Sequence, residues 1–248
     1  MIWSQDDIIF PLHAVGASPP LPSGGERLQV RTSDGNTLHG VHVKPADAGS
    51  AGKTLIVGFG GNAWNGEDVA SYLSKVYPDA DVVAFHYRGY RPSTGKPSAE
   101  ALLADAPLVF DAAAKRVPTK RTVVVGFSIG TGVAASLAKR RPISGMILIT
   151  PFDSLKKVAS ETYPWFPVGL FFEHEFDAAS ALEGSDVPVA IIAAERDELI
   201  PPERTDALRK VAPNLVFDRT IDGAGHNDIY ARSEFQSAMD EALQVILP

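Results

Sequence analysis

A serine flanked by glycines is the first candidate for chemistry. Ser128 lies between Gly126 and Gly130 in a G-x-S-x-G pattern, after the β-branched run 123–125 and before the alanine-rich run 131–139. The first run is typical of a buried strand and the second of a packed helix. The pattern predicts a sharp turn that holds the serine hydroxyl above the sheet edge, where larger side chains at the glycine positions would clash. Alternatively, Ser128 only caps the helix.

A serine hydroxyl is a weak nucleophile at neutral pH, so it needs a base that takes its proton as the new bond forms. Histidine suits this task, and the chain has six histidines, at positions 13, 39, 42, 86, 174 and 226. We select His226, because it alone follows the last predicted strand in a glycine-rich loop, where the backbone can bring the ring toward Ser128.

A carboxylate must hold the imidazole in its productive tautomer and stabilise its cation. Asp197 is the preferred acid, because it follows the apolar run 189–194 and precedes His226 in the sequence. Glu195 in the same loop could compete with it. Asp153 is the stronger rival, since an acid behind the preceding strand can still reach the same histidine. The other interpretation of Asp153 is that it caps the next helix.

The oxyanion formed in acyl transfer needs two fixed donors, and backbone amides serve without reorganisation. One is predicted to be the amide of Ile129, directly after the nucleophile. The other is predicted to be the amide of Asn62, in the loop after the strand 53–59. An ordinary Gly-Asn turn is the alternative for Asn62.

The elements that must position these groups alternate between strand and helix, which predicts an α/β domain with a mostly parallel eight-stranded sheet and helices on both faces. Ser128, Asp197 and His226 each follow a strand, at the sheet edge where reactive groups gather. An antiparallel hairpin is expected at residues 26–44, around an Asp-Gly turn. The predicted strands are 27–33, 37–44, 53–59, 81–86, 123–125, 143–149, 187–194 and 215–221, and the predicted helices are 67–76, 99–116, 131–139, 201–211 and 234–246.

Two regions depart from this alternation. Residues 1–25 are rich in proline and glycine, and we expect them to form an arm on the surface of the domain 26–248. Residues 151–186 are rich in aromatic residues and proline, and we expect a small lid of short helices over one end of the sheet. Trp165 and Phe171 would then line an apolar acyl pocket, or alternatively fill an ordinary core.

Composition excludes several classes of protein. The chain of 248 residues has no cysteine, which rules out disulfides, thiolate metal sites and a cysteine nucleophile. The formal charge is −7 and no long basic run occurs, which disfavours nucleic-acid binding. The acidic N-terminus is unlike a signal peptide, and no apolar run could span a membrane. The sequence predicts a soluble, cytoplasmic protein that acts on a small molecule without metal or cofactor.

The order of serine, acid and histidine, each behind its own strand, resembles the α/β-hydrolase superfamily over nearly all of the chain from Glu26. Within it the chain is similar to small serine hydrolases related to serine aminopeptidases and to the prolyl-oligopeptidase catalytic domain. Their oxyanion loop reads His-Gly-Asn-Ala-Gly-Asn, and the matching residues here are Gly60-Gly61-Asn62-Ala63-Trp64-Asn65. The segments 87–98 and 152–165 also match. The resemblance implies the α/β-hydrolase fold with a small helical lid.

Three residues depart from the pattern of that group. Gly60 replaces its histidine, which is expected to leave the oxyanion loop less firmly held. Trp64 replaces its glycine, and the indole is expected to narrow or line the substrate pocket. Arg91 replaces a small residue. It is either a surface arginine or a cation at the pocket mouth that favours substrates with a carboxylate or phosphate.

Together these residues predict a serine hydrolase that cleaves an acyl bond through an acyl-enzyme intermediate, with a modest apolar carboxylic ester as the expected substrate. Ser128 would attack, His226 would carry the proton and Asp197 would orient the ring. Four alternatives stay open: a thioesterase, an aminopeptidase, a cofactor-free perhydrolase on the same residues, and a binding protein that kept the fold without its activity.

Overall fold

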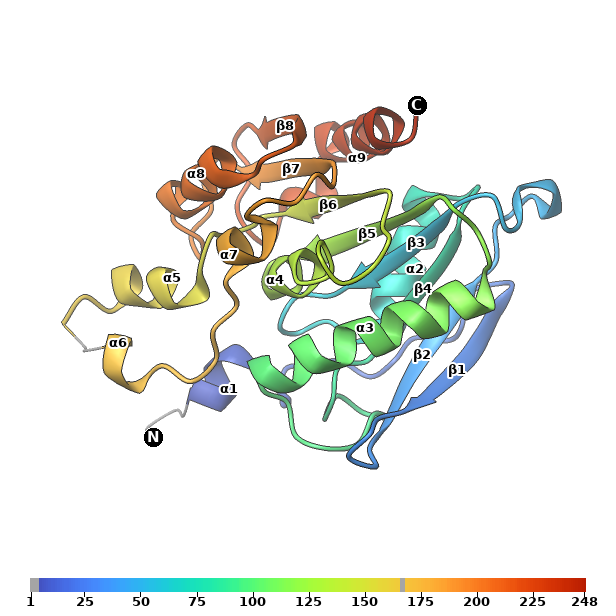
Figure 1. The fold of residues 1–248 in the computed structure, drawn as a ribbon, viewed down its shortest axis with the longest axis horizontal. Coiled ribbons are helices and arrows are strands. Elements are labelled where there is room, and N and C mark those ends of the chain that lie inside the picture. The colour runs from blue at the N-terminus through green and yellow to red at the C-terminus, as the bar shows by residue number, and fades with distance from the viewer. Residues whose placement is uncertain (1–4, 166–167) are drawn as a thin grey trace. The chain divides into compact units, whose positions relative to one another are not determined.

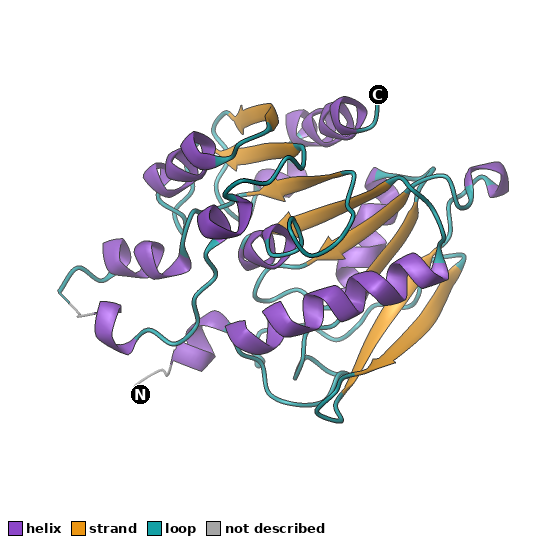
Figure 2. Ribbon diagram, in the orientation of Figure 1, coloured by secondary structure: helices purple, strands orange, loops and turns teal. Residues whose placement is uncertain are grey.

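The computed structural model describes residues 5–165 and 168–248. The chain divides into two compact units, Met1–Val124 and Val125–Pro248, and the boundary falls inside β5 (Thr122–Phe127). An eight-stranded, mostly parallel sheet accompanied by helices confirms the predicted fold class (Figure 2).

The first unit is built on four strands in the order β1-β2-β4-β3. β1 (Gly25–Arg31) and β2 (Thr37–Val43) form the predicted antiparallel hairpin. β2 is antiparallel to β4 (Asp81–Phe85), and β4 is parallel to β3 (Leu55–Phe59). Every residue of β3 and β4 is buried, as expected for strands that are covered on both faces.

Two helices cover the strands of the first unit. α2 (Gly66–Val76) begins after Asn65, whose side chain accepts a hydrogen bond from the amide of Asp68, and α3 (Ala99–Arg116) begins after the capping residue Ser98. Such caps satisfy amides that have no partner within the helix. In Figure 1, α3 lies in front of the strands of this unit and α2 lies behind them. The first unit therefore has the helix-sheet-helix layering that the alternating pattern predicts.

The segment expected to be a surface arm is partly folded into the first unit. It contains a short helix, α1 (Gln5–Ile9), and both Ile9 and Phe10 are buried. Asn65 Nδ2 also donates to the carbonyl oxygen of Gly16 at 3.3 Å, which ties the segment to the loop before α2. A helix of five residues is too short to produce a recognisable period, so the pattern did not reveal it. The first four residues of the predicted arm lie outside the described residues.

The second unit continues with strands in the order β5-β6-β7-β8. β6 (Gly145–Ile149), β7 (Val189–Ala194) and β8 (Leu215–Ile221) are parallel. β6 and β7 are wholly buried, whereas β8 has only Ile221 buried and its other residues are partly buried or exposed, as suits the strand at the end of the order. α8 (Pro202–Val211) and α9 (Ser233–Ile246) flank these strands at the top of Figure 1.

The helix after the serine, α4 (Ile129–Ala135), begins and ends earlier than predicted. The Ser136 hydroxyl donates to the carbonyl oxygen of Val133, and the amide of Leu137 binds Ala134 O, which is a tighter turn than an α-helix makes. The alanine-rich pattern gave no sign of this change, because alanine is accepted in both conformations.

The region predicted to be a lid consists of short helices, as expected. These are α5 (Leu155–Thr162), α6 (Val168–Phe171) and α7 (Ala178–Leu182). A bridge between Ser154 and Asp177 joins the start of α5 to the start of α7. Phe166 and Pro167 of the predicted lid lie outside the described residues.

Within residues 5–165 and 168–248, no helix is long and apolar enough to cross a membrane. The same residues include no group of three or more histidine or carboxylate side chains placed to hold a metal ion.

Candidate active site

The turn between β5 and α4 holds Ser128 at φ 51° and ψ −119°, a conformation that residues other than glycine rarely adopt. A Cβ added to Gly126 would lie 2.5 Å from the carbonyl oxygen of Gly130, so the predicted steric requirement at Gly126 is present. The side chain of Ser128 makes no capping hydrogen bond to α4, and the interpretation as a simple helix cap is therefore wrong. Strain of this kind is typical of a side chain held for function.

The structure brings Ser128, His226 and Asp197 together in one row. Nε2 of His226 lies 3.1 Å from Oγ of Ser128, and Nδ1 lies 2.8 and 3.0 Å from the two carboxylate oxygens of Asp197. A carboxylate can only accept, so Nδ1 carries the proton and Nε2 offers its lone pair to the serine hydroxyl. The side chains of His226 and Asp197 are each only 5% exposed, and little water competes for these bonds.

The carboxylate of Asp197 is fixed from its far side. Its Oδ1 accepts hydrogen bonds from the backbone amides of Leu199 at 3.0 Å and Ile200 at 2.7 Å. These amides belong to the loop that enters α8, so a local turn of the chain aims the carboxylate at His226. Hydrogen bonds from amides also stabilise the charged form that a nearly buried carboxylate needs.

The two alternative acids, Asp153 and Glu195, bind other partners. Asp153 is 2% exposed and forms ion pairs with Lys157 at 2.9 Å and Arg204 at 3.3 Å. It does not cap α5 either, because Ser154 is the capping residue there. Glu195 accepts a hydrogen bond from the backbone amide of Gly223 at 2.7 Å. Both acids therefore have structural partners, and Asp197 is the acid that contacts the ring.

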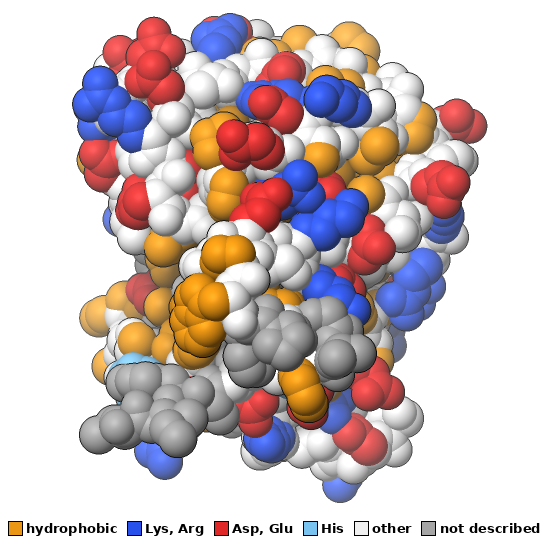
Figure 3. Space-filling view, turned by 90° about the vertical axis from the view of Figure 1, so that its left-hand side faces the viewer, with side chains coloured by type: hydrophobic (Ala, Val, Ile, Leu, Met, Phe, Trp, Pro, Cys, Tyr) orange, Lys and Arg blue, Asp and Glu red, His pale blue; other side chains and the backbone are white. Residues whose placement is uncertain are grey.

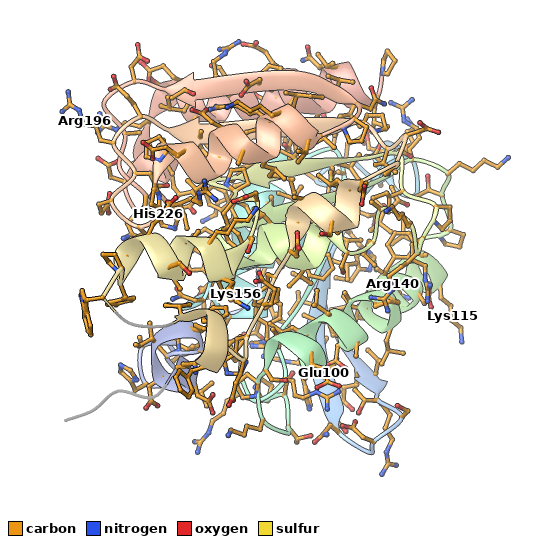
Figure 4. The ribbon with its side chains drawn as sticks, turned by 60° about the vertical axis from the view of Figure 1, so that its left-hand side comes forward. Glu100, Lys115, Arg140, Lys156, Arg196 and His226 are labelled. Atoms are coloured by element: carbon orange, nitrogen blue, oxygen red, sulfur yellow. The ribbon has the colours of Figure 1, made fainter. Side chains whose placement is uncertain are left out.

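The loop that carries His226 is joined to the loop that carries Asp197 by further bonds. The amide of Arg196 donates to the carbonyl oxygen of Ala224 at 2.8 Å, and the side chain of Arg196 points away from the loops in Figure 4, whereas His226 lies further in. Glu198 Oε2 accepts from the backbone amide of His226 at 3.0 Å. Glu198 was not among the predicted site residues, and its position directly after Asp197 was the only feature of the sequence that could have pointed to it.

The side chain of Asp228 also holds the loop that carries His226. Its Oδ1 accepts from the amide of Gly225 at 2.6 Å and its Oδ2 from Arg232 at 2.6 Å. The bond from the Gly225 amide, and then the Arg232 guanidinium, lower the pKa of Asp228 below its usual value. The carboxylate thus stays charged and keeps its hold on the loop over a wide pH range.

The loop of the first unit that carries Asn62 is held by two tyrosines. The Tyr87 hydroxyl donates to the carbonyl oxygen of Gly60 at 2.7 Å, and the Tyr90 hydroxyl donates to that of Asn62 at 2.6 Å. Burial raises the pKa of both phenols, so both remain donors. The sequence suggested a loosely held loop in the absence of a histidine at position 60, but these hydroxyls supply other anchors.

A side chain at position 60 would crowd Val69 and the Cβ of Trp64. A Cβ on Gly60 would lie 2.9 Å from Cγ2 of Val69 and 3.1 Å from Cβ of Trp64. The indole packs edge-on against Tyr72, with 5.7 Å between ring centroids. Burial raises the pKa of Tyr72 to about 12. Glycine at position 60 therefore fits the close approach of Val69 and of the Trp64 Cβ.

The other candidates for substrate binding are exposed. Trp165 is 79% and Phe171 57% exposed, so neither fills the core. Figure 3 faces the side of the molecule that carries α5 and α6 and shows hydrophobic side chains on that surface. In the first unit, Arg91 is exposed and lines a groove of about 770 Å³ together with Leu12, Val15 and Pro92.

Comparisons with known proteins agree with this fold. A family model described as alpha/beta hydrolase fold matches residues 55–185, more than half of the chain. An uncharacterized protein of Mycobacterium tuberculosis is 30% identical over 234 residues, which are 92% of this chain and 82% of that protein. Alpha/beta hydrolase domain-containing protein 17C of Homo sapiens is 28% identical over 223 residues, which are 88% of this chain and 65% of that protein.

Solved structures show the same fold at lower sequence identity. An esterase of Pyrococcus furiosus has a TM-score of 0.71 at 19% identity, covering 100% of this chain and 95% of that chain. An alpha-beta hydrolase of Vibrio vulnificus also has a TM-score of 0.71, at 20% identity, covering 90% of this chain and 81% of the other. Together with the family model and the M. tuberculosis relative, these likenesses show that the chain belongs to the alpha/beta hydrolase family.

Proposed function

We propose that this protein is a serine hydrolase that cleaves carboxylic esters through an acyl-enzyme intermediate. The observation that carries the proposal is the row of Asp197, His226 and Ser128, linked by contacts of 2.8 and 3.1 Å. An isolated serine hydroxyl is a weak nucleophile, but beside an imidazole oriented by a carboxylate it can lose its proton as it attacks. Membership of a hydrolase family and the likeness to an esterase support the same chemistry.

In the first half-reaction, Oγ of Ser128 attacks the carbonyl carbon of the ester while Nε2 of His226 takes the hydroxyl proton. The resulting imidazolium is stabilised by Asp197, which itself remains ionised. His226 then gives the proton to the leaving alcohol oxygen as the ester bond breaks. The acyl group is left on Ser128, and the imidazole is neutral again.

In the second half-reaction, water takes the place of the alcohol. His226 removes one proton from the water as its oxygen attacks the acyl carbon, and returns a proton to Oγ of Ser128 as the acyl bond breaks. The products are a carboxylic acid and the free hydroxyl. The chemistry needs no metal or organic cofactor.

We assign the oxyanion hole to the backbone amides of Ile129 and Asn62. Ile129 directly follows Ser128 and begins α4, so its amide has no carbonyl partner within the helix. Asn62 lies in a loop that two buried tyrosines anchor by its carbonyl groups. Donors that are fixed in advance stabilise the developing charge without having to reorganise.

For substrate selection we propose Trp64, Trp165 and Phe171 as apolar contacts and Arg91 as a cation for substrates with a carboxylate or phosphate. Arg91 forms no hydrogen bond or ion pair with any residue in 5–165 or 168–248, and its groove has apolar walls. If Arg91 binds a substrate anion, Arg91→Ala should lower kcat/KM for the mono-p-nitrophenyl ester of a dicarboxylic acid by about tenfold and leave a neutral ester unchanged. Equal activity on both esters would remove Arg91 from the site.

The direct test is covalent labelling with a fluorophosphonate probe. Wild-type protein should be labelled at Ser128, and Ser128→Ala and heat-denatured protein should not. A panel of p-nitrophenyl esters of increasing chain length, run beside thioesters and aminoacyl amides, then identifies the leaving group. Failure of the folded protein to label and to turn over any member of the panel would contradict the proposal and favour a binding protein.

The same panel separates the other activities. Turnover of thioesters or aminoacyl amides in preference to esters would make the protein a thioesterase or an aminopeptidase on the same residues. Peroxide-dependent halogenation in acetate buffer would indicate a perhydrolase. Each outcome keeps the row of Ser128, His226 and Asp197 and changes only the substrate or the acyl acceptor.

A further inference from the structure

The residue directly after Asp197 contacts the same histidine at its other end. Asp197 accepts from Nδ1 of the His226 ring at 2.8 Å, and Glu198 Oε2 accepts from the His226 backbone amide at 3.0 Å. Two adjacent carboxylates of one loop thus bind both the ring and the backbone of one residue in another loop, 28 residues further along the chain. The amide of His226 has no partner from a helix or strand ladder, because the residue lies in a loop between β8 and η2 (Ile229–Ala231).

The close approach of Glu198 depends on the residue before the histidine. A Cβ added to Gly225 would lie 2.8 Å from Oε2 of Glu198, which is closer than real Cβ atoms approach. The carboxylate is the end of a flexible side chain, so it would move away at little cost to the fold. Gly225 therefore keeps open the space in which Glu198 reaches the His226 amide.

We infer that Glu198 is a positioning residue for His226, and that it keeps the imidazole at the distance from Ser128 that proton transfer requires. This inference rests on the proposed hydrolase function. The ring turns about its Cα–Cβ and Cβ–Cγ bonds, and its position also follows the backbone of His226. Glu198 holds the backbone amide and Asp197 holds Nδ1, so the two contacts together restrict where Nε2 points. A displacement of about 1 Å in such a group can lower a reaction rate about 100-fold.

A neighbouring contact provides a matched control. Glu195 Oε2 accepts from the amide of Gly223 at 2.7 Å, so it is also a carboxylate from the acid loop that binds an amide of the histidine loop. It is attached three residues before His226 and does not touch that residue's backbone. If the carboxylates merely hold the two loops together, loss of either should have the same effect.

The experiment compares Glu198→Ala, Glu198→Gln, Gly225→Ala and Glu195→Ala with the wild type, using the best p-nitrophenyl ester. We expect Glu198→Ala and Gly225→Ala to lower kcat about 10- to 100-fold with KM unchanged within about twofold. Glu198→Gln keeps an oxygen acceptor and should stay within about threefold of the wild type, as should Glu195→Ala. The double variant Glu198→Ala with Gly225→Ala should be no slower than the slower single variant, because both remove the same bond.

A second measurement does not depend on turnover. The proton between His226 Nδ1 and Asp197 should give a far-downfield proton resonance in the wild type that is absent in His226→Ala. Glu198→Ala and Gly225→Ala should weaken it, because a freer ring exchanges its proton faster. Glu198→Gln and Glu195→Ala should retain it. Circular dichroism and thermal melting verify that each variant is folded.

Three results would overturn the inference. The first is full kcat and an unchanged resonance in Glu198→Ala. The second is an equal loss in Glu195→Ala, which would indicate general tethering of the loops. The third is a loss in Glu198→Gln as large as in Glu198→Ala, which would indicate a role for the charge. Failure of the hydrolase proposal is separate, because it would appear as a wild type that neither labels at Ser128 nor turns over any ester, or as undiminished turnover in Ser128→Ala, and the resonance would still report on the His226 ring.

Discussion

Within residues 5–165 and 168–248, two buried pairs of histidine and aspartate are similar in distance, and one of them contacts a serine. His226 and Asp197 are 2.8 Å apart at Nδ1 and Oδ2, with both side chains 5% exposed. In the first unit, His42 and Asp81 are 2.6 Å apart at Nε2 and Oδ1, with both side chains 4% exposed. Judged by distance and burial, the two pairs could not be told apart.

They differ in what faces the second ring nitrogen. Nε2 of His226 lies beside the hydroxyl of Ser128, which can give up a proton. Nδ1 of His42 instead accepts from Nε of Arg116 at 3.2 Å, and a guanidinium does not give up its proton in proteins. His42 also lies within β2, held by the strand ladder, whereas His226 lies in a loop. A buried pair of this kind can act as a general base only when its remaining lone pair faces a hydroxyl that loses its proton as it attacks.

Loss of the serine or the histidine should have the largest effect. Ser128→Ala and His226→Ala should each lower kcat by about 10⁴-fold or more, and the double variant should be little worse, because the residues act as a unit. His42→Ala, the matched change in the other pair, should leave kcat within about threefold, since scattered changes outside a site rarely alter turnover more. Steady-state kinetics on a neutral ester measures all four. Roughly additive losses in the double variant would show that Ser128 and His226 do not share one reaction.

The aspartates provide the second test. Asp197→Asn should lower kcat by about 10⁴-fold, because an amide can donate to Nδ1 and so favours the wrong tautomer of His226. Asp81→Asn should leave turnover within about threefold, because His42 is no part of the chemistry. The ratio of the two effects measures how far the pairs differ in function. Equal losses of activity in both variants would show that the two pairs do not differ in function.

The sequence located the pair of His226 and Asp197 but could not locate the pair of His42 and Asp81. The residues around Ser128 were enough to predict its position, because a strand, two glycines and a helix must follow one another for the turn to form. His226 and Asp197 follow from strand ends, which parallel strands bring to one edge. The pairing of His42 with Asp81 depends on the register between β2 and β4, in which His42 faces Val83, and no local pattern encodes that register.

The same limit explains what else the sequence did not reveal. Glu198 follows the acid directly, yet its contact with the His226 amide depends on how two loops approach each other. Trp165 looked equally suited to a core or a pocket, because exposure is decided by what the rest of the chain covers. The short helix α1 lacked the length to give a periodic signal, and the burial of Phe10 had no local pattern to predict it. Features set by strand order were predictable, and features set by side-chain contacts between loops were not.

The pair of His42 and Asp81 should contribute more to the free energy of unfolding than the pair of His226 and Asp197, which is the reverse of the order expected for activity. His42→Ala leaves Asp81 buried with the amide of Gly52 as its remaining side-chain hydrogen bond among the described residues, so the free energy of unfolding should fall by about 3 kcal/mol. His226→Ala leaves Asp197 with two amide donors, one more than Asp81 keeps, so the loss should be smaller, about 1 kcal/mol. Urea unfolding followed by circular dichroism measures both. A larger loss for His226→Ala would mean that the reactive pair is also the main structural one.

A third buried histidine, His86, shows what happens without an acid within hydrogen-bonding distance. It is 2% exposed, and its Nδ1 has no hydrogen-bond partner among the described residues. Burial lowers the pKa of His86 from 6.5 to about 4, although the charge of Glu67 acts in the opposite direction and His39 reinforces the shift. The folded protein therefore keeps this ring neutral in a range of pH where the unfolded chain protonates it.

The consequence is a loss of stability on acidification, smaller than the effects above. Between the unfolded pKa of 6.5 and the folded pKa of about 4, the unfolded state binds more protons at His86 than the folded state does. The contribution of neutral His86 to the free energy of unfolding is therefore fully present above pH 6.5 and is lost as the pH falls through this range. At pH 5 the loss from this group should be about 2 kcal/mol relative to pH 8. His86→Gln should remove that part of the pH dependence in urea unfolding measured at both pH values. An unchanged pH dependence of stability in the variant would show that folding does not lower the pKa of His86.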